Sequence, residues 1–282
     1  MNPKKEGMEM RMITLFAMSL LGGCLSWFGG NDQPIDYGTP PTKNPNAAAV
    51  VIGMEYSSFA GACPGALIDS QRMYKLWSAY TDDIVLFNDM NATKDAVVAA
   101  LKNAIDNHEL VYIYYSGHGG SGGYNAQETD GKDEFLCLFD QPLVDDAIWE
   151  IISKSKGRVF LMFDCCHSQT MFRSNTIDFS GSIKRFRAKK KLWAKKNKAR
   201  SEVINDDSGL KMLCWSGCPD DTVSYGSSAG GMFTNSMLDK FRFYETYSGM
   251  WKKVSTDKEL LRAEKPQQTI IGSWDVTKPV FQ

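Results

Sequence analysis

Apolar residues along the chain fall alternately into short runs and into helical spacing, which predicts strands and helices in turn. Short runs rich in β-branched and aromatic residues indicate buried strands; they are Ala47–Met54, Ile84–Phe87, Leu110–Tyr115, Arg158–Phe163, Met212–Trp215 and Thr269–Trp274. Apolar residues three or four apart predict helices; these lie within 66–80, 93–105, 145–154 and 233–241. Strands that alternate with helices predict an α/β domain with a mostly parallel sheet covered on both faces.

The N-terminal region has the pattern of an export signal. Lys4, Lys5 and Arg11 precede an apolar run of 17 residues, Met12–Phe28, as expected of a signal sequence. Within this run, the residues ending at Cys24 resemble the bacterial lipobox, in which the chain is cut before a cysteine that then carries lipid. Residues 1–24 are therefore expected to be a signal peptide or membrane anchor, with Cys24 as the lipidation site, in a bacterial cell envelope. An uncleaved anchor and an ordinary signal peptide are the alternatives.

Composition and charge exclude several classes to which this protein could belong. Apolar residues at 43% and aromatic residues at 12% exclude a disordered or fibrous chain. Three histidines argue against a His-rich metal site, and seven cysteines are too few for a disulfide scaffold. The net charge of -1 conceals an uneven distribution of charge along the chain, because ten of the 17 residues in 184–200 are Lys or Arg. Without those ten, 22 bases face 33 acids, and the rest of the chain carries a formal charge of -11.

Two predicted strands end in residues suited to nucleophilic catalysis. The third strand is followed by Ser116-Gly117-His118-Gly119, and the fourth by Asp164-Cys165-Cys166-His167. The carboxyl ends of parallel strands meet at one edge of the sheet, where ligands bind. A histidine there can take the proton of a cysteine thiol, and the thiolate can attack a carbonyl carbon.

The positions of the histidines in the sequence indicate which one is the catalytic base, but the positions of the cysteines do not indicate which one is the nucleophile. His167 adjoins the cysteines in sequence and is poorly directed to activate them, and His108 precedes its strand and so lies at the opposite edge. His118 is therefore the candidate base, whereas geometry alone does not separate Cys165 from Cys166. Backbone N–H groups of Gly119 and of the nucleophile itself are the candidate donors to a tetrahedral oxyanion.

These motifs resemble the two catalytic motifs of metacaspases, which are cysteine peptidases with the caspase fold. The segments 215–221 and 69–73 are similar to two further metacaspase blocks, and together the four cover roughly residues 48–240. The resemblance implies a caspase-like three-layer sandwich, with Cys166 as nucleophile and His118 as base. Gln169 departs from the family pattern, which usually has glycine there.

The resemblance also implies a division of the chain. Residues 25–46, with four prolines among Gly and Asn, are expected to be a flexible linker. The peptidase domain is expected at 47–282, with a large-subunit-like part at 47–175, a basic linker at 176–210 and a small-subunit-like part at 211–282. We interpret the basic run as a site of self-processing; contact with lipid or nucleic acid and a solvated helix are the alternatives. No nucleic-acid partner is expected, and the oligomeric state is left open.

Acidic residues near the proposed site indicate the substrate class. Asp69, Asp164, Asp220 and Asp221, with Ser116 beside the base, offer carboxylates to a guanidinium or ammonium group. Metacaspases cut after Arg or Lys, so the resemblance implies the same preference. The sequence thus predicts a cysteine endopeptidase that cleaves polypeptides after Arg or Lys. The alternatives are another caspase-like peptidase, such as a gingipain or legumain relative, and an inactive scaffold that binds peptides or partners.

The chemistry itself requires no cofactor, but an acidic loop offers a place for calcium as an activator. Asp130, Asp133 and Glu134 lie in a segment that resembles the loop of calcium-dependent metacaspases. Carboxylate oxygens in a glycine-containing loop suit this hard cation. Arg173 stands in the region where the family has a further acidic ligand, which disfavours the ion.

Overall fold

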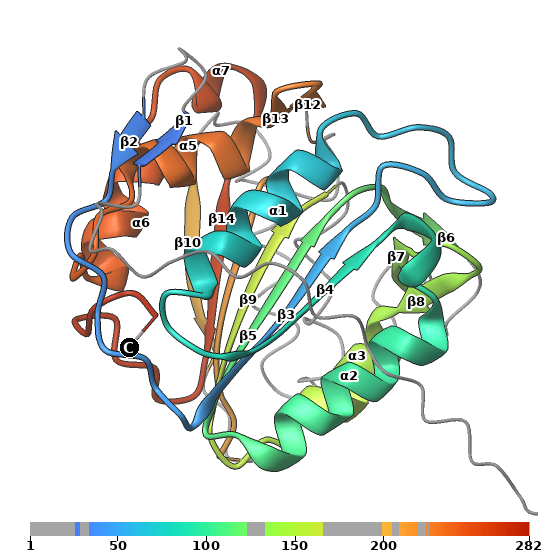
Figure 1. The fold of residues 1–282 in the computed structure, drawn as a ribbon, viewed down its shortest axis with the longest axis horizontal. Coiled ribbons are helices and arrows are strands. Elements are labelled where there is room, and N and C mark those ends of the chain that lie inside the picture. Colours follow the sequence, from blue (N-terminus) through green and yellow to red (C-terminus); the bar gives the residue numbers. More distant parts are fainter. Residues whose placement is uncertain are drawn as a thin grey trace, which may run out of the picture.

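The computed structural model describes residues 26–28, 34–122, 133–165, 199–204, 209–218, 224 and 226–281. These residues form an α/β domain in three layers, with helices on both faces of a central sheet (Figure 1). This arrangement confirms the fold class expected from the sequence. The proposed export signal and Cys24 lie outside the described residues. Within the ranges given above, no helix has the length and the apolar character to cross a membrane.

The central sheet has seven strands, in the order β10-β14-β11-β9-β5-β3-β4. Their bounds are β3 (Ala47–Gly53), β4 (Asp83–Asn88), β5 (Leu110–Ser116), β9 (Arg158–Asp164), β10 (Arg200–Ile204), β11 (Lys211–Ser216) and β14 (Gln267–Ile271). Neighbouring strands are parallel except for β11 and β14. All six predicted strands are present, although β14 spans Gln267–Ile271 rather than Thr269–Trp274, and the edge strand β10 was not predicted.

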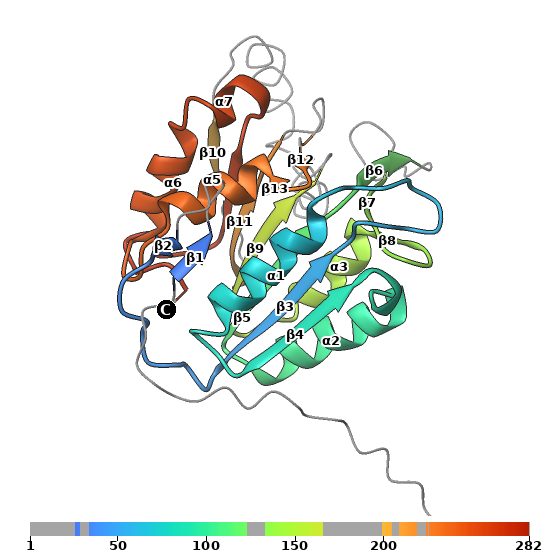
Figure 2. The ribbon, with the colours of Figure 1, turned by 45° about the horizontal axis from the view of Figure 1, so that its top comes forward.

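Helices pack on the sheet in two groups (Figure 2). One face carries α1 (Ala66–Trp77), α5 (Met232–Lys240), α6 (Tyr247–Ser255) and α7 (Leu260–Ala263); the other carries α2 (Lys94–Asn107) and α3 (Asp145–Ile152). The Thr93 hydroxyl caps α2, because it accepts a hydrogen bond from the backbone N–H of Ala96. The helix α6 was not predicted.

The two-residue period of the strands determines which side chains reach each face. In β5, Tyr112 and Tyr114 join the core under α1 and α5, while Tyr115 joins the core under α2 and α3. The register pairs Ser116 with Asp164 at the carboxyl ends of β5 and β9. By the same alternation, both residues project toward the face that α1 and α5 cover.

Short strands add to this framework at the carboxyl edge of the sheet. A three-stranded sheet consists of β6 (Gly119–Gly122), β7 (Asp133–Cys137) and β8 (Pro142–Val144), and a hairpin consists of β12 (Gly226–Ser227) and β13 (Gly230–Gly231). The sequence does not mark them, because strands of two to five residues are too short to show a hydrophobic period.

Part of the segment expected to be a flexible linker is packed on the domain. β1 (Ser26–Phe28) pairs with β2 (Pro34–Asp36), and Tyr37, directly after β2, is only 3% exposed. The Tyr37 ring centroid lies 5.6 Å from that of Phe241, and its carbonyl oxygen accepts a hydrogen bond of 2.9 Å from the Phe243 N–H. An aromatic ring gains enough from burial to hold this stretch of chain against the domain.

We therefore expect Tyr37→Ala to destabilise the protein. Loss of a buried aromatic ring should lower the free energy of unfolding by about 3 kcal/mol. Unfolding in urea measures this change, and Tyr56→Ala, at a tyrosine that is 60% exposed, is the matched control. Equal stability of the two variants would show that Tyr37 does not hold the segment in place.

Candidate active site

Two buried carboxylates lie together at the carboxyl edge of the sheet. Asp69, in the first turn of α1, is fully buried, and Asp164, the last residue of β9, is 4% exposed. One oxygen of Asp69, Oδ2, accepts hydrogen bonds from Ser116 Oγ at 3.0 Å and from the Gly231 N–H at 2.8 Å. Among the described residues, no donor reaches its other oxygen, Oδ1.

Asp164 is surrounded by donors. Its Oδ2 accepts hydrogen bonds from the Thr234 N–H at 2.9 Å and from Thr234 Oγ1 at 2.7 Å, and its Oδ1 accepts one from Ser224 Oγ at 2.6 Å. The Tyr114 hydroxyl lies 2.7 Å from Thr234 Oγ1 and extends this network into the core. Because the Thr234 N–H belongs to the first turn of α5, Asp164 also benefits from the positive end of the helix dipole.

The backbone at Gly231 fits tightly against both carboxylates. Its N–H donates to Asp69, and a Cβ placed on Gly231 would lie 2.2 Å from Asp164 Oδ2. A side chain at this position would push against a buried carboxylate and against the start of α5. Glycine is therefore required where β13 leads into α5.

Burial and mutual repulsion determine the ionisation of the two acids. Burial raises the pKa of Asp69 well above its usual range, and the nearby charge of Asp164 raises it further. Hydrogen bonds from Gly231 and Ser116 and the charge of Arg72 act in the opposite direction. Burial also raises the pKa of Asp164, against the hydrogen bonds from Ser224 and Thr234. A cation entering between the two carboxylates would relieve both effects.

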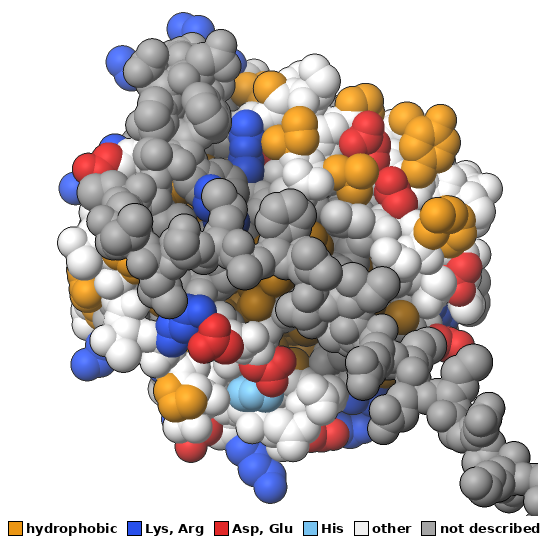
Figure 3. Space-filling view, in the orientation of Figure 1, with side chains coloured by type: hydrophobic (Ala, Val, Ile, Leu, Met, Phe, Trp, Pro, Cys, Tyr) orange, Lys and Arg blue, Asp and Glu red, His pale blue; other side chains and the backbone are white. Residues whose placement is uncertain are grey.

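His118 lies just beyond the carboxyl end of β5, and a backbone carbonyl group contacts its ring. The Nε2 atom is 3.3 Å from the carbonyl oxygen of Ala62, in the loop between β3 and α1. Because a carbonyl oxygen only accepts, this contact requires a proton on Nε2, which leaves Nδ1 of the neutral ring to accept one. The loop also exposes Tyr56 (60%) and Phe59 (49%), and Figure 3 shows hydrophobic side chains gathered at the upper right, where this loop lies.

The structure places the two adjacent cysteines differently. Cys165 is fully buried in the core beneath α2 and α3, and its carbonyl oxygen lies 3.4 Å from Cys218 Sγ. Full burial argues against Cys165 as a nucleophile that a polypeptide reaches. Cys166 lies outside the described residues.

The remaining predicted site residues are placed in part. Gly119 begins β6 directly after His118, and Glu134 is buried in β7 at 2% exposure. Asp133 begins β7 and is described by its backbone only, whereas Asp130, Asp220 and Asp221 lie outside the described residues. In the part of the chain with described side chains, no group of three or more His, Cys, Asp or Glu residues is arranged to hold a metal ion.

Several residues of the site were not found from the sequence. Gly231, Thr234 and Ser224 hold the two carboxylates, and none of them belongs to a motif used above. The Gly230–Gly231 pair before a helix was the one available signal, because such a pair marks a close approach of backbone.

Comparison with known proteins identifies the family to which the chain belongs. The sequence model of the family described as "Caspase domain" matches residues 46–281, which is most of the chain. The chain belongs to the caspase-domain family. Solved structures share the fold: a crystallised protein from Geobacter sulfurreducens has a TM-score of 0.64 at 22% identity, covering 84% of this chain and 99% of its own. Caspase-1 from Spodoptera frugiperda has a TM-score of 0.50 at 10% identity, covering 84% and 96%.

Within the caspase-domain family, metacaspases are similar in sequence. Metacaspase-1 of Arabidopsis thaliana is 26% identical over 74% of this chain and 61% of its own length. Metacaspase-1 of Lodderomyces elongisporus is 24% identical over 80% of this chain and 65% of its own length. The chain thus spans about three fifths to two thirds of the length of these curated relatives.

The raised pKa of Asp69 predicts a pH-dependent loss of stability. The folded protein binds the Asp69 proton more tightly than the unfolded chain does, so stability falls as pH rises from the unfolded pKa of about 4 toward the folded one. Asp69→Asn removes this titration and keeps an acceptor for Ser116 and Gly231. We expect the variant to become more stable relative to the wild type as pH rises, in urea unfolding from about pH 5 to 8. Asp106→Asn, at an exposed position of α2, is the control; parallel curves for wild type and Asp69→Asn would contradict the assignment.

Proposed function

We propose that this caspase-domain protein is a cysteine endopeptidase that hydrolyses peptide bonds after Arg or Lys. The observation that carries the proposal is the buried pair Asp69 and Asp164 at the same sheet edge as His118. Asp69 Oδ1 has no donor among the described residues, and a guanidinium or ammonium group would supply one. Charge-assisted hydrogen bonds of this kind are about twice as strong as neutral ones.

In the proposed mechanism, His118 and Cys166 form the catalytic dyad. Nδ1 of His118 takes the proton of the Cys166 thiol, and the thiolate attacks the carbonyl carbon of the scissile bond. The N–H groups of Gly119 and Cys166 stabilise the oxyanion of the tetrahedral intermediate. His118 then gives its proton to the leaving amine, so that the C–N bond breaks and a thioester forms. Water, deprotonated by the same imidazole, hydrolyses the thioester and restores the thiol.

The Ala62 carbonyl group supports this role of the histidine. Its oxygen lies 3.3 Å from Nε2 and accepts the proton on that nitrogen, so the basic nitrogen is on the other side of the ring. As the ring becomes positively charged during the reaction, the same carbonyl oxygen stabilises the charge. The loop between β3 and α1 therefore orients the base.

The preference for a basic residue at P1 follows from the charges. A P1 aspartate would place a third carboxylate beside two buried ones, and like charges at short range are strongly unfavourable. A P1 Arg or Lys instead neutralises the pair and lowers the cost of keeping both carboxylates ionised. Ser116, which donates to Asp69, holds that carboxylate in place.

Peptides that differ only at P1 test the proposal. We expect cleavage after Arg and none after Asp, and loss of all cleavage in Cys166→Ala. Asp164→Asn should raise KM for the Arg peptide about 10- to 100-fold, because it removes the charge from a charge-assisted hydrogen bond. An Arg-directed covalent thiol probe should label the wild type but not Cys166→Ala. Faster cleavage after Asp would refute the specificity, and the absence of both cleavage and labelling would favour an inactive scaffold.

We also propose that the peptidase cuts its own basic run. Residues 184–200 include ten Lys or Arg; they follow β9 in the chain, end at Arg200, the first residue of β10, and lie outside the described ranges before residue 199. An Arg- or Lys-specific enzyme would find its preferred residues there in a segment between two parts of the same domain.

Purified protein tests self-processing directly. The wild type is expected to appear as two fragments whose masses place the cut within 184–200, and Cys166→Ala as one chain, by mass spectrometry. Two fragments in both proteins would show that another protease makes the cut. An intact wild type that still cleaves Arg peptides would show that processing does not occur.

A further inference from the structure

One arginine joins α1 to the hairpin β12–β13 and to α5. Arg72 lies three residues after Asp69 on α1 and is half-buried. Its Nη1 donates hydrogen bonds to the Ala229 carbonyl oxygen at 3.0 Å and to Asn235 Oδ1 at 2.7 Å. Ala229 lies in the turn between β12 and β13, and Asn235 lies near the start of α5. The guanidinium group therefore contacts two segments that follow it by 157 and 163 residues in the chain.

The contacts of Arg72 matter for the hairpin because the hairpin is too small to be stable by itself. Its strands have two residues each, and an isolated two-stranded hairpin is marginal in water. The Asn235 Nδ2 group donates to the same Ala229 carbonyl oxygen at 3.3 Å, and the Ala229 N–H donates to Ser227 Oγ at 3.1 Å. The hairpin is thus fixed through the backbone of its turn.

The position of the hairpin decides whether Asp69 keeps its backbone donor. Gly231, the last residue of β13, donates to Asp69 Oδ2 at 2.8 Å. A Cβ placed on Gly230 would lie 2.3 Å from Asp69 Oδ1 and 3.3 Å from Arg72 Nη1, so the backbone of β13 lies against both side chains. With φ at +108°, Gly230 also has a conformation that favours glycine. If the hairpin moved away from α1, Ser116 would be left as the one described donor to Asp69 Oδ2.

Arg72 holds the hairpin and leaves Asp69 Oδ1 open. Residues three apart on a helix can pair directly, yet among the described residues no donor reaches Asp69 Oδ1. The Nη1 group of Arg72 is directed to Ala229 and Asn235 instead. Burial raises the pKa of Asp69, and the charge of Arg72 is among the effects that lower it. The arginine therefore favours the ionised form of the acid without occupying the oxygen that a cation from outside would use.

We infer that Arg72 is a positioning residue of the P1 pocket. By binding Ala229 and Asn235 it holds the hairpin against α1, so that Gly231 directs Asp69 and leaves its Oδ1 open to the P1 cation. Arg72 does not bind the P1 residue itself. The contact with the hairpin follows from the hydrogen bonds alone, whereas the role in P1 recognition rests on the proposed function.

Inhibitors that differ only in the charge at P1 test the positioning role. Peptide aldehydes ending in Arg or in citrulline have nearly the same shape, but citrulline is neutral. The inhibition constant of the citrulline aldehyde divided by that of the Arg aldehyde therefore measures recognition of the charge. In Arg72→Met we expect this ratio to fall about three- to tenfold, the effect of one hydrogen bond, while kcat for an Arg peptide is unchanged. An unchanged ratio would overturn the role in P1 recognition, because a general loss of structure weakens both inhibitors equally.

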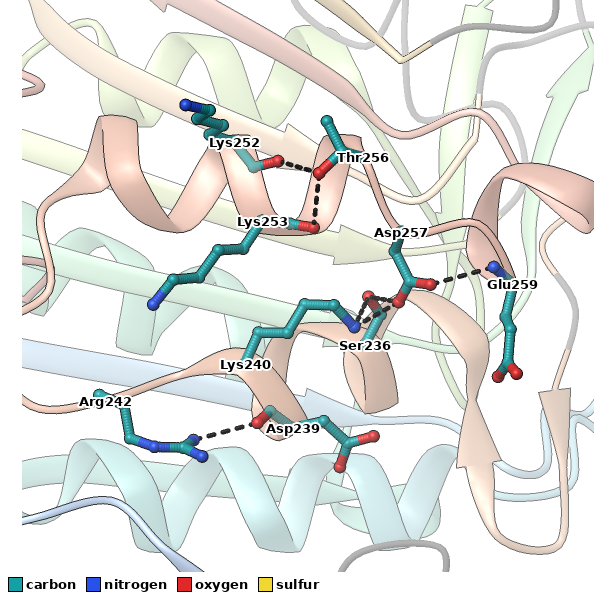
Figure 4. Close-up of polar contacts among 9 residues, drawn as sticks. All are labelled: Ser236, Asp239, Lys240, Arg242, Lys252, Lys253, Thr256, Asp257 and Glu259. Carbon is teal, nitrogen blue, oxygen red and sulfur yellow. Dashed lines mark hydrogen bonds and ion pairs between the residues drawn. The ribbon is translucent and has the colours of Figure 1, made fainter.

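Two further variants separate the contact of Arg72 with the hairpin from its charge. Asn235→Ala removes one acceptor and keeps the arginine, and it should also lower the ratio. If Arg72→Met lowers the ratio and Asn235→Ala does not, the charge acts without the hairpin and the inference is wrong. Arg242→Met is the matched control, because Arg242 Nη1 also donates to a backbone carbonyl oxygen, that of Asp239 at 3.0 Å, but within its own turn of the chain (Figure 4). This variant should keep the ratio of the wild type.

Amide hydrogen exchange, measured by NMR, tests the contact with the hairpin without any substrate. The Gly231 N–H should exchange about three- to tenfold faster in Arg72→Met and in Asn235→Ala than in the wild type. The Gly249 N–H, which donates to a side-chain oxygen at the start of α6, is the matched control and should exchange at the same rate in all three proteins. Unchanged protection of Gly231 in both variants would overturn the inference. If the wild type cleaves no Arg or Lys peptide, the proposed function fails, but the exchange rates still decide whether Arg72 holds the hairpin.

Discussion

The site depends on one constraint: two carboxylates are buried side by side at the carboxyl edge of the sheet. Buried charges of like sign are unfavourable unless donors surround them. The structure supplies these donors from elements far apart in sequence, namely Ser116 at the end of β5, Gly231 at the end of β13 and Thr234 in α5. The hairpin β12–β13 and the start of α5 therefore have to pack where they do, and a glycine is needed at the point of closest approach.

The sequence predicted the framework because the framework follows local rules. Runs of apolar residues located the strands, and the two-residue period brings Ser116 and Asp164 to one face. The sequence placed Asp69 and Asp164 among the acids near the proposed site but did not pair them, since no local rule connects residues on α1 and β9. The buried acids therefore meet because of tertiary packing, not because of any spacing in the sequence.

What the sequence did not predict also has a physical reason. Two of the donors to the acid pair are backbone N–H groups, which every residue except proline has and no motif marks. Glu264 stands in the stretch Arg262-Ala263-Glu264-Lys265, which has the composition of an exposed turn although the Glu264 side chain is fully buried. The packing of Tyr37 was hidden by the prolines around it, whose local preference for extended chain does not exclude docking against an aromatic core.

The acidic residues outside the basic run differ in where they lie. Much of the acidic excess outside the basic run lies on the surface, where water screens it, but Asp69, Asp164 and Glu264 are buried. Three ionised carboxylates in one region of the interior are strongly unfavourable unless donors or cations lie beside them. Asp69 keeps an oxygen, Oδ1, that no described donor reaches. A cationic side chain would complete the hydrogen bonds of that oxygen and offset the repulsion between Asp69 and Asp164. Under the proposed function, the interaction that makes this acid pair unfavourable is therefore also the one that favours Arg or Lys at P1.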